Sequence, residues 1–446
     1  MAAAHRPDPE RYAPPHIEAA RTGSDLRRGL SRRGFLASAA AAGGAYFLGR
    51  LAPASAQTPT LSDADIVVPD DPTSILGMSL SQRGLRSPFV HAQRLINDPD
   101  APLGVAGWTF SPLQDLEGIV TPSDLHFERH HAGVAMIDPT EHRLVVHGMV
   151  DQAKQYTLWD LERMPQESHI YFVECSGNSL AGYPGGAADD TAQSIHGLVS
   201  TSEWVGVPMR EIIEDVGLDP SSTWALFEGA DAAVMTRSVP VEKLIDDAFI
   251  ALYQNGEPIR PAQGYPMRLV LPGWEGNMQI KWLRRIEFGD APFQTKEETR
   301  HYTDRLPDGR ARQFTYAMEA KSVITRPSPG RGLAGAGQWT ISGIAWSGRG
   351  RIERVEVSTD DGNTWEDATL LGENLPRSTV RFHYPWEWDG EEAVLMSRAT
   401  DETGYVQPTR EALLDVRGEG YTYHYNGIQT WRLHSDGTLS NGYVDA

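Results

Sequence analysis

The chain contains a single cysteine, Cys175, among its 446 residues. An intramolecular disulfide needs two thiols, and so do Cys-rich zinc sites, iron–sulfur clusters and the C-x-x-C-H attachment of haem. We therefore expect none of these in this chain, and no haem. The fold must be stabilised by apolar cores, for which a hydrophobic content of 40% supplies the material.

Residues 1–56 differ in composition from the remainder of the chain. The paired arginines of Ser31-Arg32-Arg33-Gly34-Phe35-Leu36 precede a short Ala/Gly-rich apolar run, and Ala54-Ser55-Ala56 has the form of a cleavage site. This run is shorter than a bilayer-crossing helix, so we expect no membrane anchor. The segment resembles a twin-arginine (Tat) signal peptide, which predicts export to the periplasm in the folded state. An ordinary secretory signal is the alternative.

The formal net charge is −20, and loss of the Arg-rich leader would make it more negative. Nucleic acid and anionic membrane surfaces carry the same sign of charge and are therefore not expected as partners. A basic protein partner fits this charge. The alternative is that the charge serves only solubility.

Periodicity divides the remaining chain into segments. Residues 57–100 are polar and rich in Pro and Asp, and predict an extended N-terminal arm. Residues 101–317 mix strand-like runs, 143–147 and 169–173, with helical patterns at 208–216 and 241–249, which predicts an α+β domain. Residues 318–434 alternate with period two and predict an all-β, Ig-like sandwich, followed by a tail at 435–446. The Pro/Gly-rich stretch 326–332 reads as a linker before the all-β pattern.

Cys175 follows the strand-like run and opens a Gly-containing turn. In an arbitrary protein a lone cysteine is more often an inert buried thiol. In an exported protein an unpaired thiol is a liability unless it is buried or coordinated, and a soft thiolate at the end of a strand is a suitable metal ligand. Cys175 is therefore the candidate metal ligand.

Several motifs then occur in an order that resembles the sulfite oxidase-type molybdopterin family. The resemblance covers nearly all of the chain after the leader, and the motifs are Phe127-Glu128-Arg129-His130-His131, Cys175-Ser176-Gly177-Asn178, Phe227-Glu228-Gly229-Ala230-Asp231, Gly264-Tyr265-Pro266-Met267-Arg268, Ile280-Lys281-Trp282-Leu283, Arg300-His301-Tyr302 and Asp415-Val416-Arg417-Gly418. The segments around Ala345-Trp346-Ser347-Gly348 and Gly362-Asn363-Thr364-Trp365 resemble the Ig-like dimerisation domain of that family.

The resemblance implies a mixed α/β molybdopterin-binding domain and assigns roles to its residues. Cys175 would bind molybdenum, and Phe127, His131, Asp231, Arg268 and Lys281 would bind the cofactor. Arg129, Tyr302 and Arg417 would be catalytic, with the two arginines facing an anionic sulfur substrate. An anionic cofactor and an anionic substrate both require fixed cations, which fits this set.

Two departures bear on the substrate. Sulfite-oxidising members of the family commonly continue C-x-G-N-R-R, whereas this chain has Ser179-Leu180 there and Glu174 before the cysteine. Loss of an arginine favours a substrate other than free sulfite, and the runs around Arg129 and Cys175 most resemble the sulfane dehydrogenase branch. At Gln263 the animal members have a pterin-contacting histidine, which leaves that contact open.

The resemblance predicts a periplasmic oxidoreductase that oxidises sulfane sulfur on the cysteine of a carrier protein to the sulfonate level during thiosulfate oxidation. With no haem motif here, electrons would pass to a c-type cytochrome, which the resemblance implies is a dihaem subunit. A homodimer through the Ig-like domain within a heterotetramer is also implied. The alternatives are a free sulfite dehydrogenase and an exported binding or assembly protein without chemistry.

Overall fold

The computed structural model describes residues 77–102, 104–418 and 421–444. The predicted signal peptide and the first part of the predicted arm lie outside these residues. Within the described part of the arm, residues 77–94 contain no helix or strand, and β1 (Leu95–Ile96) then pairs with β2 (Gly107–Phe110). Among the described residues no helix is both long and apolar enough to cross a membrane.

In its described residues the first domain contains three sheets of three or more strands, with short helices between them. The strands are, in sheet order, β1, β2 and β3 (Glu128–His130); β11 (Glu257–Pro258), β10 (Phe249–Gln254), β7 (Val199–Pro208) and β6 (Glu167–Glu174), with β12 (Arg268–Val270) beside β10; and β5 (Lys154–Tyr156), β4 (Leu144–Gly148), β13 (Leu283–Gly289), β8 (Trp224–Gly229) and β9 (Thr236–Pro240). Only the β4–β13 pair is parallel in these sheets. The short hairpin of β14 (Asp304–Arg305) and β15 (Ala311–Arg312) follows. The helices are α2 (Leu158–Glu162), α3 (Ala192–His196), α4 (Met209–Val216), α5 (Val241–Asp246) and the π-helical turn η7 (Glu297–His301).

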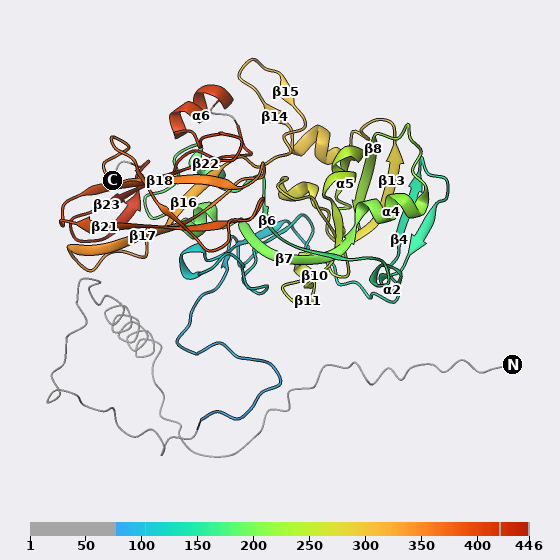
Figure 1. The fold of residues 1–446 in the computed structure, drawn as a ribbon, viewed down its shortest axis with the longest axis horizontal. Helices are drawn as coiled ribbons and strands as arrows, with labels where there is room; N and C mark the ends of the chain where they lie inside the picture. Colours follow the sequence, from blue (N-terminus) through green and yellow to red (C-terminus); the bar gives the residue numbers. More distant parts are fainter. Residues whose placement is uncertain (1–76, 103, 419–420, 445–446) are drawn as a thin grey trace. The chain divides into compact units, whose positions relative to one another are not determined.

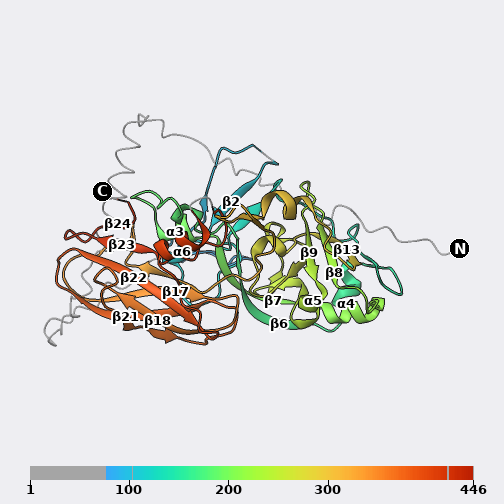
Figure 2. The same ribbon diagram turned by 90° about the horizontal axis from the view of Figure 1, so that it is seen from above.

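Helices α4 and α5 lie against the sheet of β8 and β13 (Figures 1 and 2). Helix α4 begins after Pro208, ends at Gly217 in the left-handed conformation, and buries Met209, Ile212 and Val216 on one face, as its sequence predicts. The prediction for 241–249 is wrong at its end. Helix α5 ends at Asp246. Phe249 begins the buried strand β10, so the side chain of Phe249 packs as part of a sheet and not of a helix.

The second domain is a sandwich of a four-stranded and a five-stranded sheet, coloured orange to red in Figure 1. Its strands are, in sheet order, β16 (Lys321–Arg326), β17 (Gly337–Trp346), β21 (Val380–Trp388) and β20 (Thr369–Leu371); and β19 (Glu366–Asp367), β18 (Ile352–Ser358), β22 (Ala393–Asp401), β23 (Thr430–Leu433) and β24 (Leu439–Asn441). Helix α6 (Arg410–Arg417) lies between β22 and β23 in sequence. The expected α+β domain followed by an all-β sandwich is therefore confirmed.

The position of the expected linker is wrong. Strand β16 pairs with β17 from Lys321 onward, so the sandwich already begins before the Pro/Gly-rich stretch. Residues 327–332 form the loop between these two strands, and Pro327, Ser328 and Pro329 are buried. Proline and glycine therefore mark a loop inside the domain here. Both residues favour the backbone angles of turns, which a buried loop requires as well as a linker.

The two domains share a hydrophobic core. Phe172 on β6 and Val199 on β7 belong to the cluster that contains Trp346 and Trp431 of the sandwich. The backbones also meet directly. The amide of Met318 donates to the carbonyl of Gly273 at 3.0 Å, and the amide of Gly348 donates to that of Met318 at 2.7 Å.

This close approach leaves no room for a side chain at Gly348. A Cβ added to Gly348 would lie 2.0 Å from the carbonyl oxygen of Gly273. A Cβ added to Gly273 would lie 2.2 Å from the carbonyl oxygen of Gly348. We expect Gly348→Ala to lower the free energy of unfolding by about 1–3 kcal/mol, because backbone atoms cannot yield as flexible side chains do. Chemical denaturation measures this change. Gly107→Ala is the control, since nothing lies within 4 Å of its Cβ position, and equal stability of the two variants would contradict the prediction.

Candidate active site

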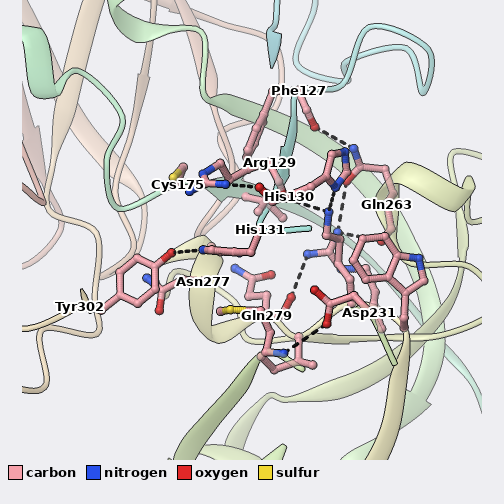
Figure 3. A pocket seen from close by; sticks show the side chains of 17 residues that line it. Phe127, Arg129, His130, His131, Cys175, Asp231, Gln263, Asn277, Gln279 and Tyr302 are labelled. Atoms are coloured by element: carbon pink, nitrogen blue, oxygen red, sulfur yellow. Dashed lines mark hydrogen bonds between the residues drawn. The ribbon is translucent and has the colours of Figure 1, made fainter. Parts of the chain in front are cut away.

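A pocket lies in the first domain, between the end of β6, strand β3 and the loops around β12. Its wall comes from segments that are far apart in the sequence (Figure 3). The lining residues are Phe127, Arg129, His130, His131, Val173, Cys175, Asp231, Met235, Gln263, Arg268, Gly276, Asn277, Gln279, Ile280, Lys281, Trp282 and Tyr302. Eight of the nine predicted site residues are therefore brought together in one pocket.

Cys175 lies directly after β6 and has its backbone held on both sides. Its amide donates to the carbonyl of Leu198 at 3.0 Å, and its carbonyl accepts from the amide of Asn178 at 2.8 Å. The side chain is buried and unpaired. Burial raises the pKa of the thiol, while the positive charge of Arg129 acts in the opposite direction. A metal cation in this pocket would favour the thiolate and bind it.

Arg129 stands beside the cysteine on β3. Its guanidinium lies 5.3 Å from the centre of the Trp108 ring and donates to the carbonyl of His130. Trp108 is the cross-strand partner of Arg129 on β2, so the strand pairing itself places the ring under the cation. The structure thus holds a half-buried positive charge at the cysteine end of the pocket.

His131 and Tyr302 meet across the pocket. The Nε2 atom of His131 lies 2.8 Å from the hydroxyl of Tyr302, and this hydrogen bond is drawn in Figure 3. Burial, together with the positive charges of Arg129 and Lys281, lowers the pKa of His131 to about 3. Burial likewise raises the pKa of Tyr302 far above its usual range. Both groups are therefore uncharged at neutral pH, and the hydrogen bond between them adds no charge to the pocket.

The adjacent histidines point to different partners. The Nε2 atom of His130 donates to the carboxylate of Glu128 at 3.0 Å, and its Nδ1 atom accepts from the ammonium of Lys281 at 2.9 Å. His131 instead contacts Tyr302. Adjacent side chains on an extended backbone point to opposite sides, which accounts for the two directions.

The other end of the pocket carries buried cations. Arg268 is 2% exposed and donates to the backbone carbonyl of Gln263 at 3.1 Å and to its side-chain oxygen at 3.2 Å. Burial lowers its pKa to about 9. The ammonium of Lys281 donates to the carbonyls of Arg129 and Ala262, both at 2.9 Å, and burial holds its pKa well below the usual value. Asp231, also buried, accepts from the amide of Met235 at 3.2 Å.

These residues fit an anionic, polar cofactor such as molybdopterin. The Nε atom of Arg268 and the Oε1 atom of Gln279 are buried and lack a hydrogen-bond partner among the described residues, and both side chains line the pocket. A buried polar atom without a partner is costly, so these two atoms mark where a ligand would complete the hydrogen bonding. The desolvated cations Arg268 and Lys281 would be stabilised by a negative phosphate for the same reason. Phe127 adds a buried aromatic side wall.

Gln263 is part of this end of the pocket. Its side-chain amide donates to the carbonyl of Phe127 at 2.7 Å, and its oxygen accepts from Arg268. Gln263 therefore links Phe127, the residue before β3, to the buried guanidinium of Arg268.

Sequence reasoning missed four polar or aromatic residues that line the pocket: His130, Asn277, Gln279 and Trp282. His130 lies within the quoted motif that contains Arg129, and the other three lie within or beside the quoted motif that contains Lys281.

Arg417 is the predicted site residue that the structure does not bring into the pocket. It ends α6, where its guanidinium is ion-paired with Glu319 and donates to the carbonyl of His424. The ring of Tyr421 lies 5.2 Å from it. A carboxylate of the second domain thus binds this cation, and the role of Arg417 toward the substrate stays a prediction.

The residues that flank Cys175 also point elsewhere. Glu174 and Ser179 are buried behind the pocket, at 1% and 2% exposure, and Leu180 is half exposed; none of the three lines the pocket. That the missing arginine favours a substrate other than free sulfite stays a prediction. Leu180 supplies no positive charge. Arg129, on β3, is the arginine that lines the cysteine end of the pocket.

Residues 131–297 match the family model of the oxidoreductase molybdopterin binding domain, and residues 312–430 match that of the Mo-co oxidoreductase dimerisation domain. The chain is 28% identical over 404 residues to mitochondrial sulfite oxidase of Mus musculus, a match that covers 84% of this chain and 69% of the mouse protein. It is 30% identical over 355 residues to NADH nitrate reductase of Solanum lycopersicum, covering 67% and 37%.

The fold is also similar to the crystal structure of the sulfane dehydrogenase SoxCD from Paracoccus pantotrophus. The TM-score is 0.81 and the identity 43%, over 84% of this chain and 97% of that one. Since both domains match family models and nearly the whole of a solved relative is covered, the chain belongs to the sulfite oxidase-type family of molybdopterin oxidoreductases.

Proposed function

We propose that this molybdenum-dependent, sulfur-oxidising oxidoreductase acts on a sulfane sulfur held on the cysteine of a carrier protein and oxidises it to the sulfonate level. The observation that carries the proposal is a buried thiol, Cys175, beside the guanidinium of Arg129 in a pocket from which Arg417 is withdrawn into an ion pair. The similarity to a sulfane dehydrogenase at 43% identity supports it.

The overall reaction converts a carrier persulfide anion, R–S–S⁻, and three water molecules into a carrier-bound S-sulfonate, R–S–SO3⁻, with release of six protons and six electrons that the proposed cytochrome accepts. When bound, the molybdenum cofactor supplies the two-electron oxidation steps. In this chain, Cys175 would bind the metal, and Phe127, His131, Asp231, Arg268 and Lys281 would bind the cofactor. Arg129 would orient the anionic sulfur, and Tyr302, oriented by His131, would hydrogen-bond the reacting oxygens.

The electrons would leave through a c-type cytochrome, which we propose is a dihaem subunit, and the second domain would form a homodimer within a heterotetramer. The match to a dimerisation domain and the sulfane dehydrogenase neighbour support these partners.

Export to the periplasm through the Tat pathway is part of the proposal and rests on Arg32 and Arg33. Cell fractionation of the Arg32→Lys, Arg33→Lys variant is its test, and unchanged export would remove the Tat assignment.

A free sulfite dehydrogenase is the second candidate, because the curated relatives named above include sulfite oxidase. Steady-state kinetics with one cytochrome acceptor separates the two functions. We expect a higher kcat/KM with a carrier-bound persulfide than with sulfite, since a single half-buried guanidinium binds a dianion poorly. A higher kcat/KM with sulfite would establish the second candidate.

Cys175→Ser tests the metal ligand. Serine replaces the thiol by a hydroxyl with little change in shape, so we expect the variant to fold. The hydroxyl does not ionise to a soft ligand at neutral pH, so we expect no activity. The spectroscopic signature of the molybdenum–thiolate bond should disappear. Metal analysis of the parent protein provides the control, with about one molybdenum per chain expected; no metal in protein matured through its export pathway would favour a binding protein without chemistry. Full activity and unchanged spectra in the variant would reject Cys175.

Arg129→Gln tests the substrate role. Loss of a charge-assisted contact of about 1.5–3 kcal/mol predicts a decrease in kcat/KM of roughly 10- to 150-fold. The main effect should be on KM, with little change in thermal stability, because the guanidinium is only half buried. Arg163→Gln, at a 77% exposed side chain, is the matched control. Equal kcat/KM in the two variants would remove Arg129 from the site.

A further inference from the structure

A cluster of buried polar side chains lies behind Cys175, on the side of the loop that faces away from the pocket. We call the residues Glu174, Asn178, Ser179, Lys321 and Trp346 the anchoring cluster. One carboxylate oxygen of Glu174 accepts from Asn178 at 2.9 Å and from Lys321 at 3.4 Å, and the other accepts from the indole of Trp346 at 2.6 Å. Lys321 also donates to the hydroxyl of Ser179 at 2.6 Å.

The cluster joins the two domains. Glu174, Asn178 and Ser179 flank the cysteine, whereas Lys321 opens β16 and Trp346 ends β17, both in the sandwich. The side chains of Glu174 and Lys321 are each 1% exposed. A buried ion pair persists only where its charges are fully hydrogen-bonded, and here both carboxylate oxygens and the ammonium have partners.

The loop itself needs this support. Ser179 has a φ of 65°, in the left-handed region that non-glycine residues adopt at a cost, and its hydroxyl is held by Lys321 and by His196 at 2.6 Å. On the opposite side, a Cβ at Gly276 would lie 2.8 Å from the carbonyl oxygen of Glu174. The segment that carries Cys175 is therefore fixed from both sides and has no space in which to shift.

We propose that Glu174 and Lys321 are positioning residues that fix the orientation of the Cys175 side chain, so that the second domain determines the geometry of the metal–thiolate bond. The inference rests on the proposed role of Cys175 as metal ligand. Neither residue lines the pocket, so neither touches the substrate. Their influence passes through the loop, by the side-chain bond from Asn178 to Glu174 and the backbone bond from Asn178 to the carbonyl of Cys175.

The test compares Glu174→Gln, Lys321→Gln and the double variant in the cofactor-loaded enzyme. Each single change leaves one buried charge without its counterion. The double change leaves two neutral amides, in which the oxygen at position 174 can accept from Asn178 and the NH2 at position 321 can donate to Ser179, while the indole of Trp346 loses its acceptor. We expect each single variant to lose about 10- to 100-fold in kcat with KM unchanged within about threefold, and to shift the Mo(V) electron paramagnetic resonance signal. The double variant should retain more kcat and shift the signal less than either single variant, because the two sites act as one unit.

Glu356→Gln is the matched control. Its carboxylate is also buried and ion-paired, with Arg398, but lies within the sandwich. It should lose stability while kcat and the resonance signal stay those of the parent. Trp346→Phe provides a milder variant that removes only the indole donor to Glu174, and it should shift the signal in the same direction, even where a single charge variant fails to fold.

Parent-like kcat and signal in the single variants and in Trp346→Phe would overturn the positioning role. So would a double variant no better than the poorer single variant. Failure of the underlying assignment is distinguishable, because Cys175→Ser would then keep the molybdenum–thiolate signal. If Cys175→Ser loses that signal while the cluster variants keep it, the ligand stands and the proposed pair is rejected.

Discussion

The rest of the site depends on the fixed backbone of one residue, Cys175. Its amide and carbonyl are both hydrogen-bonded within the first domain, and the carboxylate of the preceding Glu174 is bonded to the second. A single thiol can serve as a specific metal ligand only if its direction is set, since one bond leaves a metal free to move. The shared core around Phe172 and Trp346 and the backbone contact of Gly273 with Gly348 hold the two domains at the distance that this bonding requires.

The pocket reverses the electrostatics of the chain as a whole. The formal net charge is −20, yet Arg129, Arg268 and Lys281 all line one cavity. Burial lowers the pKa of Arg268 and Lys281, which means that desolvation opposes their charged forms. An anionic group in the cavity would offset that penalty. The cost of burying these cations is therefore consistent with a protein built to hold a phosphate-bearing cofactor.

Much of the fold follows from local patterns. Strands β4 and β6 and helix α4 were predictable, because alternation, the start at Pro208 and the stop at Gly217 are written in adjacent residues. The end of α5 was not, since Phe249 suits a helix face and a buried strand equally. The residues predicted to bind cofactor and substrate lie in the pocket except for Arg417, whose position depends on Glu319, almost a hundred residues away. Partners at such separation leave no local signal.

The surroundings of Glu174 show the same limit. Glu174 lies directly before Cys175 in the sequence, and only the fold shows that its carboxylate pairs with Lys321 on the far side of the loop. The charge of the pocket wall therefore comes from its lining residues, which are Arg129, Arg268, Lys281 and Asp231 among the charged ones. An ion pair that is closed on itself behind Cys175 adds no net charge to the pocket, so it can act on the site only through the loop that it holds.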